Sequence, residues 1–129
     1  MNPVCKEITE AVISSTLIDE YTISAKLNFS IKFIGFRGHF ESKPVLAAAC
    51  ALEVVKTILC QTLNLKLKLT EIKIAKFFNP IGNSENISLT ITSVKSLKDV
   101  ILLQQISIRA LFEKVNEKAM ILQLNFEIK

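Results

Sequence analysis

The sequence is poor in the residues that most often build metal centres and nucleic-acid contacts. Its 129 residues include one histidine, two arginines and three cysteines. Cys5, Cys50 and Cys60 are odd in number and lack the close spacing of zinc ligands, so no metal or cofactor is expected. Cys50 and Cys60 would lie about 15 Å apart along one helix, which is too far for a disulfide. We therefore expect reduced thiols and a cytoplasmic protein.

The basic residues are spread along the chain and do not form a cluster. Lysine and arginine number 16 against 12 acidic residues, which gives a formal net charge of +4. In the stretch 66–76 the lysines alternate with other residues, a pattern typical of a solvated strand face. Nucleic-acid binders usually concentrate basic residues and add arginine or aromatic base contacts. No nucleic-acid partner is expected, although a mildly basic surface attracts acidic partners.

No export signal or membrane span is recognisable either. The first fifteen residues hold no basic region followed by an apolar run. The apolar stretch 45–63 is interrupted by charged and polar residues, which disfavours a membrane span. Half of all residues are nevertheless hydrophobic and the mean hydropathy is +0.38. A homo-oligomer that covers part of this apolar surface is therefore the default expectation.

Apolar and polar residues alternate with a period of two over most of the chain, as in half-buried strands. From Tyr21 to Ile31 every second residue is apolar or small. The same pattern returns further along the chain, at 65–77, 87–94, 106–112 and 120–128. A weaker strand is expected at about 8–18. Turn-forming segments separate the later strands at 79–86, 95–99 and 113–118.

One segment is predicted to be a long helix, from Val45 to Leu63. It contains no glycine or proline, and Ser42 with Pro44 supplies a start signal. Apolar residues cover most of its circumference and leave a narrow polar stripe of Glu53, Lys56, Thr57, Gln61 and Asn64. A helix this apolar must be enclosed. The sequence therefore predicts a single α+β domain over residues 1–129, with an antiparallel sheet wrapped around one long central helix.

Two residues near this helix stand out chemically. His39 is the chain's only imidazole, and a lone histidine is most often a packed or surface residue. Glu53 is the first acidic residue of the helix, where its ordinary role is to pair with Lys56 three positions later. Cys50 has no basic partner in register, which favours a small core residue over a nucleophile.

The string GHFESKPVLAAACALE, residues 38–53, resembles the signature of the β-hydroxyacyl-acyl carrier protein dehydratases of the hot dog superfamily. In that family Gly-His-Phe is followed by a Pro-hydrophobic pair and, fourteen positions after the histidine, by Glu or Asp. The matching residues, which align without a gap, are Gly38, His39, Phe40, Pro44, Val45, Leu46 and Glu53. Downstream, EIKIAKFFNPI (71–81) is similar to the family's strand with a Lys-Phe pair and a Pro, and the resemblance covers roughly 20–129.

This resemblance implies a hot dog fold and a lyase reaction. The implied reaction dehydrates (3R)-hydroxyacyl-acyl carrier protein thioesters to trans-2-enoyl thioesters, in fatty acid, lipid or polyene biosynthesis. His39 would be the base and Glu53 the acid, because a carboxyl group buried beside apolar residues holds its proton more tightly than in water. The implied substrate-binding residues are Gly38, Phe40, Val45 and Ala48.

The resemblance also implies partners. An acyl carrier protein would deliver the acyl chain on phosphopantetheine, and a homodimer would form each site from the histidine of one chain and the acid of the other. Higher oligomers remain open. Arg37, Lys43 and Lys76 are interpreted either as carrier contacts or as solubilising charges.

Two departures separate this chain from the family pattern. Glu41-Ser42 replaces a Pro-Gly pair after the histidine, and Ala47-Ala48 replaces a second Pro-Gly at the helix start. Ala48 keeps the N–H that binds the thioester carbonyl in the family but adds a methyl group there. Lowered activity or different substrates are therefore expected, and two alternatives stay open. One is a hot dog thioesterase in which Glu53 activates water, and the other is a non-catalytic acyl-binding module.

Overall fold

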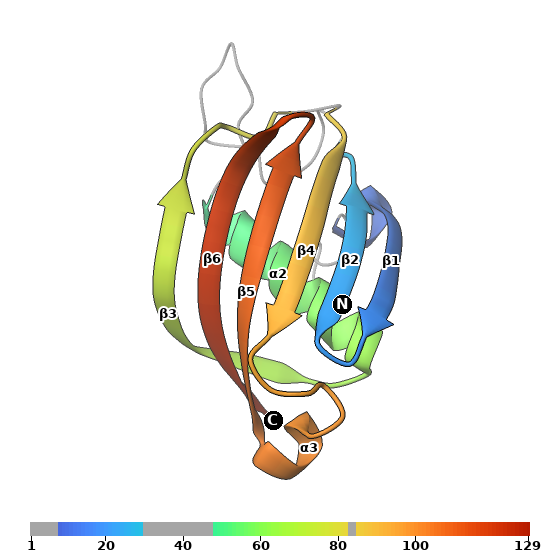
Figure 1. The fold of residues 1–129 in the computed structure, drawn as a ribbon, viewed down its shortest axis with the longest axis vertical. Helices are drawn as coiled ribbons and strands as arrows, with labels where there is room; N and C mark the ends of the chain where they lie inside the picture. Colours follow the sequence, from blue (N-terminus) through green and yellow to red (C-terminus); the bar gives the residue numbers. More distant parts are fainter. Residues whose placement is uncertain (1–7, 30–47, 83–84) are drawn as a thin grey trace.

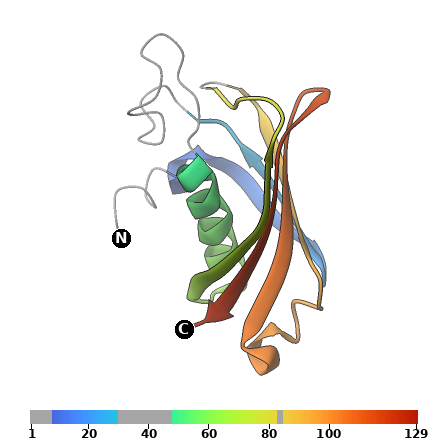
Figure 2. The same ribbon diagram turned by 90° about the vertical axis from the view of Figure 1, so that its left-hand side faces the viewer.

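The computed structural model describes residues 8–29, 48–82 and 85–129, which form one curved antiparallel sheet and the helix in its hollow. Figure 1 shows the six strands in the order β1-β2-β4-β5-β6-β3. Their bounds are β1 Val12–Asp19, β2 Thr22–Leu27, β3 Leu67–Phe77, β4 Ile87–Ser93, β5 Gln105–Lys114 and β6 Glu117–Ile128. The helices are α2, Ala48–Leu63, and the short α3, Val100–Leu103. Figure 2 shows α2 lying against the concave face of the sheet.

The predicted α+β architecture is confirmed, with a few local corrections. The weak strand expected at about 8–18 is a strand only from Val12, because residues 8–11 form a helical turn. The short helix α3 follows the turn predicted at 95–99, in a stretch for which no element was predicted, and the chain leaves α3 through Gln104, whose φ is 58°. Thr57, expected on the polar stripe, is buried. Tyr21, expected on the buried face of its strand, is 42% exposed.

The core lies between α2 and the concave face. One side of α2 is buried, and the residues that face the sheet are Ala51, Val54, Val55, Ile58 and Leu59. Every second residue of the central strands meets them, since side chains alternate between the two faces of a strand. In the paired strands β4, β5 and β6, Ile91, Ala110 and Leu122 form one such buried row. This packing fixes both the position and the rotation of α2.

The next row along the same three strands faces the opposite way. Thr92 pairs with Arg109, and Arg109 pairs with Gln123. These side chains stand on the convex face, away from α2. The sheet therefore has an apolar concave face and, in this row, a polar convex face.

The loop between β3 and β4 is tied to the hairpin that joins β5 and β6. The N–H groups of Phe78 and Asn79 both donate to the carbonyl oxygen of Ala119, at 2.9 and 3.2 Å. Lys114 Nζ lies 2.9 Å from the carbonyl oxygen of Pro80 and 2.8 Å from Glu85 Oε2. The hydrogen bond to Glu85 is the main reason that the pKa of Lys114 is raised. These contacts hold the end of β3 in place.

The two edge strands, β1 and β3, differ in what they expose. β3 carries two irregularities in its pairing with β6, one between Leu69 and Glu71 and one between Ile72 and Ile74. Ile72 pairs with Leu124, and Phe77 pairs with Met120, so both belong to the concave face. They are nevertheless 48% and 56% exposed. No helix in the described part of the chain is long and apolar enough to cross a membrane.

Replacing Leu59 with alanine should lower the free energy of unfolding by about 2–5 kcal/mol, because the change leaves a cavity beneath α2. Leu102→Ala is the matched control, since Leu102 on α3 is 84% exposed, and it should change stability by less than about 0.5 kcal/mol. Urea unfolding measures both values. Equal losses in the two variants would contradict the packing described for α2.

Candidate active site

The structure places one of the two predicted catalytic residues. Glu53 lies on α2, and Ala48 is the first described residue of that helix. His39, together with Gly38, Phe40 and Val45, lies outside the described residues. The expected pairing of His39 with Glu53 is therefore not tested by the geometry, and it stays a prediction.

Helical geometry sets the direction in which Glu53 points. Successive residues turn by about 100° around a helix, so Glu53 lies on the opposite side of α2 from Ala51 and Val55. Those two residues are buried against the sheet, while Glu53 is half-buried. Its carboxylate makes no ion pair with Lys56, or with any other residue among those described. The carboxylate is thus held on α2 without a salt bridge to any described residue.

Cys50 lies about one turn before Glu53 on α2, and the charge of Glu53 affects the pKa of its thiol. Burial, and then the negative charge of Glu53, raises the pKa of the Cys50 thiol above its ordinary value. A thiol with a raised pKa remains protonated near neutral pH and is a poor nucleophile. This supports the interpretation of Cys50 as a packing residue beside the carboxylate.

Two apolar side chains of β3 remain exposed on the concave face of the sheet. In the view of Figure 1, α2 runs diagonally behind the sheet, and its N-terminal end lies on the side of β6 and β3. Ile72 and Phe77, which the sequence analysis did not select, are the half-exposed concave-face residues of β3. A possible signal in the sequence is that both are large apolar residues on a strand with many lysines, which is typical of a partly exposed strand. Their side chains are thus accessible to a ligand or to a second chain.

Glu53 would provide one half of an acid–base pair. A carboxyl group can donate or accept a proton, but an elimination also needs a base at the neighbouring carbon. No group of three potential metal ligands is found in the described part of the chain.

The charge coupling between Cys50 and Glu53 can be tested by alkylation in a variant with Cys5→Ser and Cys60→Ser. Cys50 should react with iodoacetamide more slowly at pH 8 than an exposed cysteine, and the rate should rise as the pH increases, because the thiolate is the reactive form. Adding Glu53→Gln should speed the reaction by lowering the thiol pKa. Lys56→Gln, a charge change on the same helix, should not. Identical rates in the Glu53 and Lys56 variants would contradict the coupling.

Comparisons with known proteins agree with this fold. The family described as ApeI-like, ApeI dehydratase, matches residues 15–109, which is more than half of the chain. No curated protein matches the sequence.

Solved structures resemble the fold over nearly the whole chain. The dehydratase heterocomplex ApeI:P from Xenorhabdus doucetiae has a TM-score of 0.72 at 16% identity, covering 90% of this chain and 96% of that one. The E. coli PaaI protein from the phenylacetic acid degradation operon has a TM-score of 0.66 at 9% identity, covering 96% and 86%. A hypothetical thioesterase with coenzyme A from Streptococcus pneumoniae TIGR4 has a TM-score of 0.65 at 4% identity, covering 96% and 95%.

At these identities the structural neighbours establish the fold alone, which is the hot dog fold expected from the sequence. The family match is the more specific finding, because it spans both the histidine motif and Glu53. The chain is thus a hot dog protein that belongs to the ApeI-like dehydratase family.

Proposed function

We propose that the protein dehydrates (3R)-hydroxyacyl thioesters to trans-2-enoyl thioesters, with the substrate carried by an acyl carrier protein. The observation that carries the proposal is the position of Glu53. It stands fourteen residues after His39, within the family match, on the side of α2 that does not face the sheet. A buried structural glutamate with a salt-bridge partner would have argued against it.

The proposed mechanism uses two side chains. His39 removes the proton from C2, and the electrons of that C–H bond move toward the thioester carbonyl. The C3–O bond then breaks as the C2=C3 double bond forms, and the Glu53 carboxyl protonates the departing hydroxyl to give water. The N–H of Ala48, near the positive end of α2, stabilises negative charge on the thioester oxygen. No metal or cofactor enters these steps.

A second chain completes the site in this proposal. Glu53 lies on the side of α2 away from its own sheet, and Ile72 and Phe77 expose apolar surface on β3. β3 is an edge strand, so its outer backbone groups are free to pair with another strand. A second copy placed there would cover these apolar residues and bring its own His39 toward Glu53. Because the ApeI neighbour is part of a heterocomplex, a related dehydratase chain is the rival partner.

The direct test is an assay of the purified protein with a 3-hydroxyacyl thioester on acyl carrier protein. Enoyl product should form, and His39→Ala or Glu53→Gln should each lower the rate by about 10²–10⁴-fold, because each removes one proton-transfer step. Lys56→Gln, one turn from Glu53, should keep most of the activity. Release of free thiol without enoyl product would instead identify a thioesterase. A folded dimer inactive in both assays would indicate a non-catalytic acyl-binding module.

The proposed dimer gives a separate prediction. Ile72→Glu should shift the protein from dimer to monomer, because it puts a charge into the apolar surface that the second copy covers. Ile101→Glu is the matched control, since Ile101 is 60% exposed on the distant α3. Light scattering after gel filtration measures the mass of both variants. A dimer that persists in Ile72→Glu would place the interface elsewhere.

A further inference from the structure

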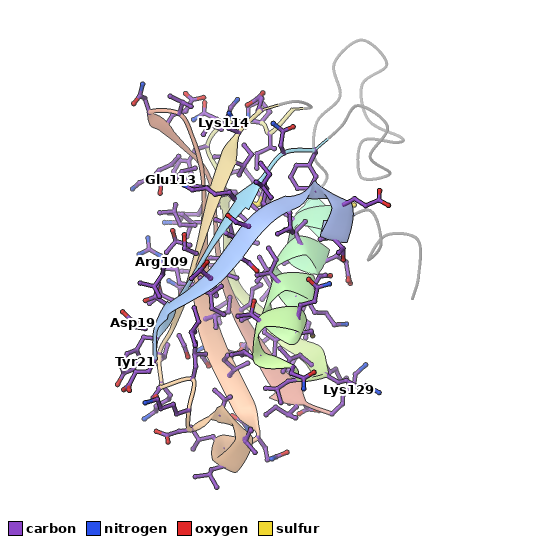
Figure 3. All side chains as sticks on the ribbon, turned by 90° about the vertical axis from the view of Figure 1, so that its right-hand side faces the viewer. Asp19, Tyr21, Arg109, Glu113, Lys114 and Lys129 are labelled. Atoms are coloured by element: carbon purple, nitrogen blue, oxygen red, sulfur yellow. The ribbon has the colours of Figure 1, made fainter. Side chains whose placement is uncertain are left out.

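A hollow lies on the convex face, on the opposite side of the sheet from α2. Its volume is about 320 Å³, which is at the small end of the range for small-molecule sites. Polar side chains from four strands line it: Lys73, Thr92, Ser107, Arg109, Gln123 and Asn125. Figure 3 shows Arg109 on this side of the sheet, away from α2.

The strand register explains why two cationic side chains meet here. Arg109 on β5 pairs with Gln123 on β6, and β6 lies between β5 and β3. Lys73 is the extra residue at the pairing irregularity between Ile72 and Ile74, and such bulges redirect a side chain. Neighbouring strands lie about 4.8 Å apart. The long side chains of Arg109 and Lys73 can therefore meet a common ligand above Gln123.

Neither cation is neutralised within the described part of the chain. Arg109 and Lys73 form no ion pair or hydrogen bond there with another side chain. The carboxylate of Glu71, which pairs with Asn125 across the strands, accepts a hydrogen bond from Asn125 Nδ2 at 2.7 Å. Glu113 lies four residues along β5 from Arg109, at roughly 13 Å. Two neighbouring cations without a counter-ion repel each other, and an anion between them would remove that cost.

Asn125 adds a hydrogen-bond acceptor to this basic hollow. Its side-chain nitrogen is held by Glu71, and its backbone oxygen accepts a hydrogen bond from Thr70 Oγ1 at 3.1 Å. Its Oδ1 is buried and has no partner among the described residues. A hydroxyl donor on a ligand would pair this oxygen.

We propose that the convex hollow binds a small phosphate ester that carries a hydroxyl group. Arg109 would hold two phosphate oxygens, as a planar guanidinium does, and Lys73 would supply a second positive charge. The ligand hydroxyl would donate to Asn125, and the hydroxyl groups of Thr92 and Ser107 complete the lining. The sheet and α2 both separate the site from Glu53, so it does not depend on the proposed dehydratase reaction.

NMR titration of the whole protein with glycerol 3-phosphate tests this proposal. The backbone amide signals of Thr92, Ser107 and Gln123 should shift and saturate, whereas glycerol should leave them unchanged. Arg109→Gln and Lys73→Gln should each raise the dissociation constant by about tenfold or more, since each removes a charge-assisted contact. Lys98→Gln is the matched control and should bind like the wild type, because Lys98 lies outside the hollow with its side chain 79% exposed.

Three results would overturn the proposal. One is the absence of saturable shifts, and another is an equal loss of binding in the Lys98 control, which would indicate general surface attraction. The third is equal affinity for inorganic phosphate and glycerol 3-phosphate, which would contradict the role of the ligand hydroxyl. Spectra of the unbound variants verify folding. Glu53→Gln should bind glycerol 3-phosphate like the wild type. The binding result can therefore be interpreted even if the protein proves not to be a dehydratase.

Discussion

The enclosure of α2 by the sheet is the constraint on which the other features depend. Ala51, Val55 and Ile58 are buried against the concave face, and they leave the helix no freedom to rotate. Because α2 is fixed in this way, Glu53 points away from the sheet. In the proposed reaction, this fixed position would let Glu53 donate its proton with little reorganisation of the protein.

The sheet separates two kinds of surface. Its concave face carries the apolar residues that pack on α2 and, toward β3, apolar side chains that remain half-exposed. Its convex face carries hydroxyl, amide and basic side chains from the alternate positions of the same strands. The alternation of side chains along the strands thus gives one sheet an apolar face and a face that carries polar side chains. A ligand on either side would contact the same strands without sharing a residue's side chain.

The sequence was sufficient for the regular elements because their periodicity reflects burial directly. Alternation located the strands, and a largely apolar stretch without glycine or proline located α2. The prediction from sequence was wrong or incomplete where contacts between distant residues, and not the local pattern, determine the structure. Residues 8–11 are helical, and Thr9 there accepts a hydrogen bond from Gln61 of α2, a contact distant in sequence. The four apolar residues of α3 are too few to show a period. The bulge that redirects Lys73 depends on register with β6, which no single strand encodes.

The candidate site was predictable only in part. The spacing from His39 to Glu53 selected the acid, and the structure places that acid on α2. Ile72 and Phe77 were not selected, because a period-two pattern assigns residues to a face but does not show which of them stay exposed there. Residues contributed by a second chain cannot be read from one chain's periodicity at all. The division of one site between two chains is therefore the claim that most needs measurement.

Subunit mixing measures that claim most directly. His39→Ala and Glu53→Gln homodimers, each inactive, are unfolded together and refolded so that half of the dimers contain one chain of each kind. If the histidine of one chain works with the glutamate of the other, each mixed dimer regains one intact site, and the mixture recovers about a quarter of wild-type activity. If both residues act within one chain, or do not act together, the mixture stays as inactive as its parents.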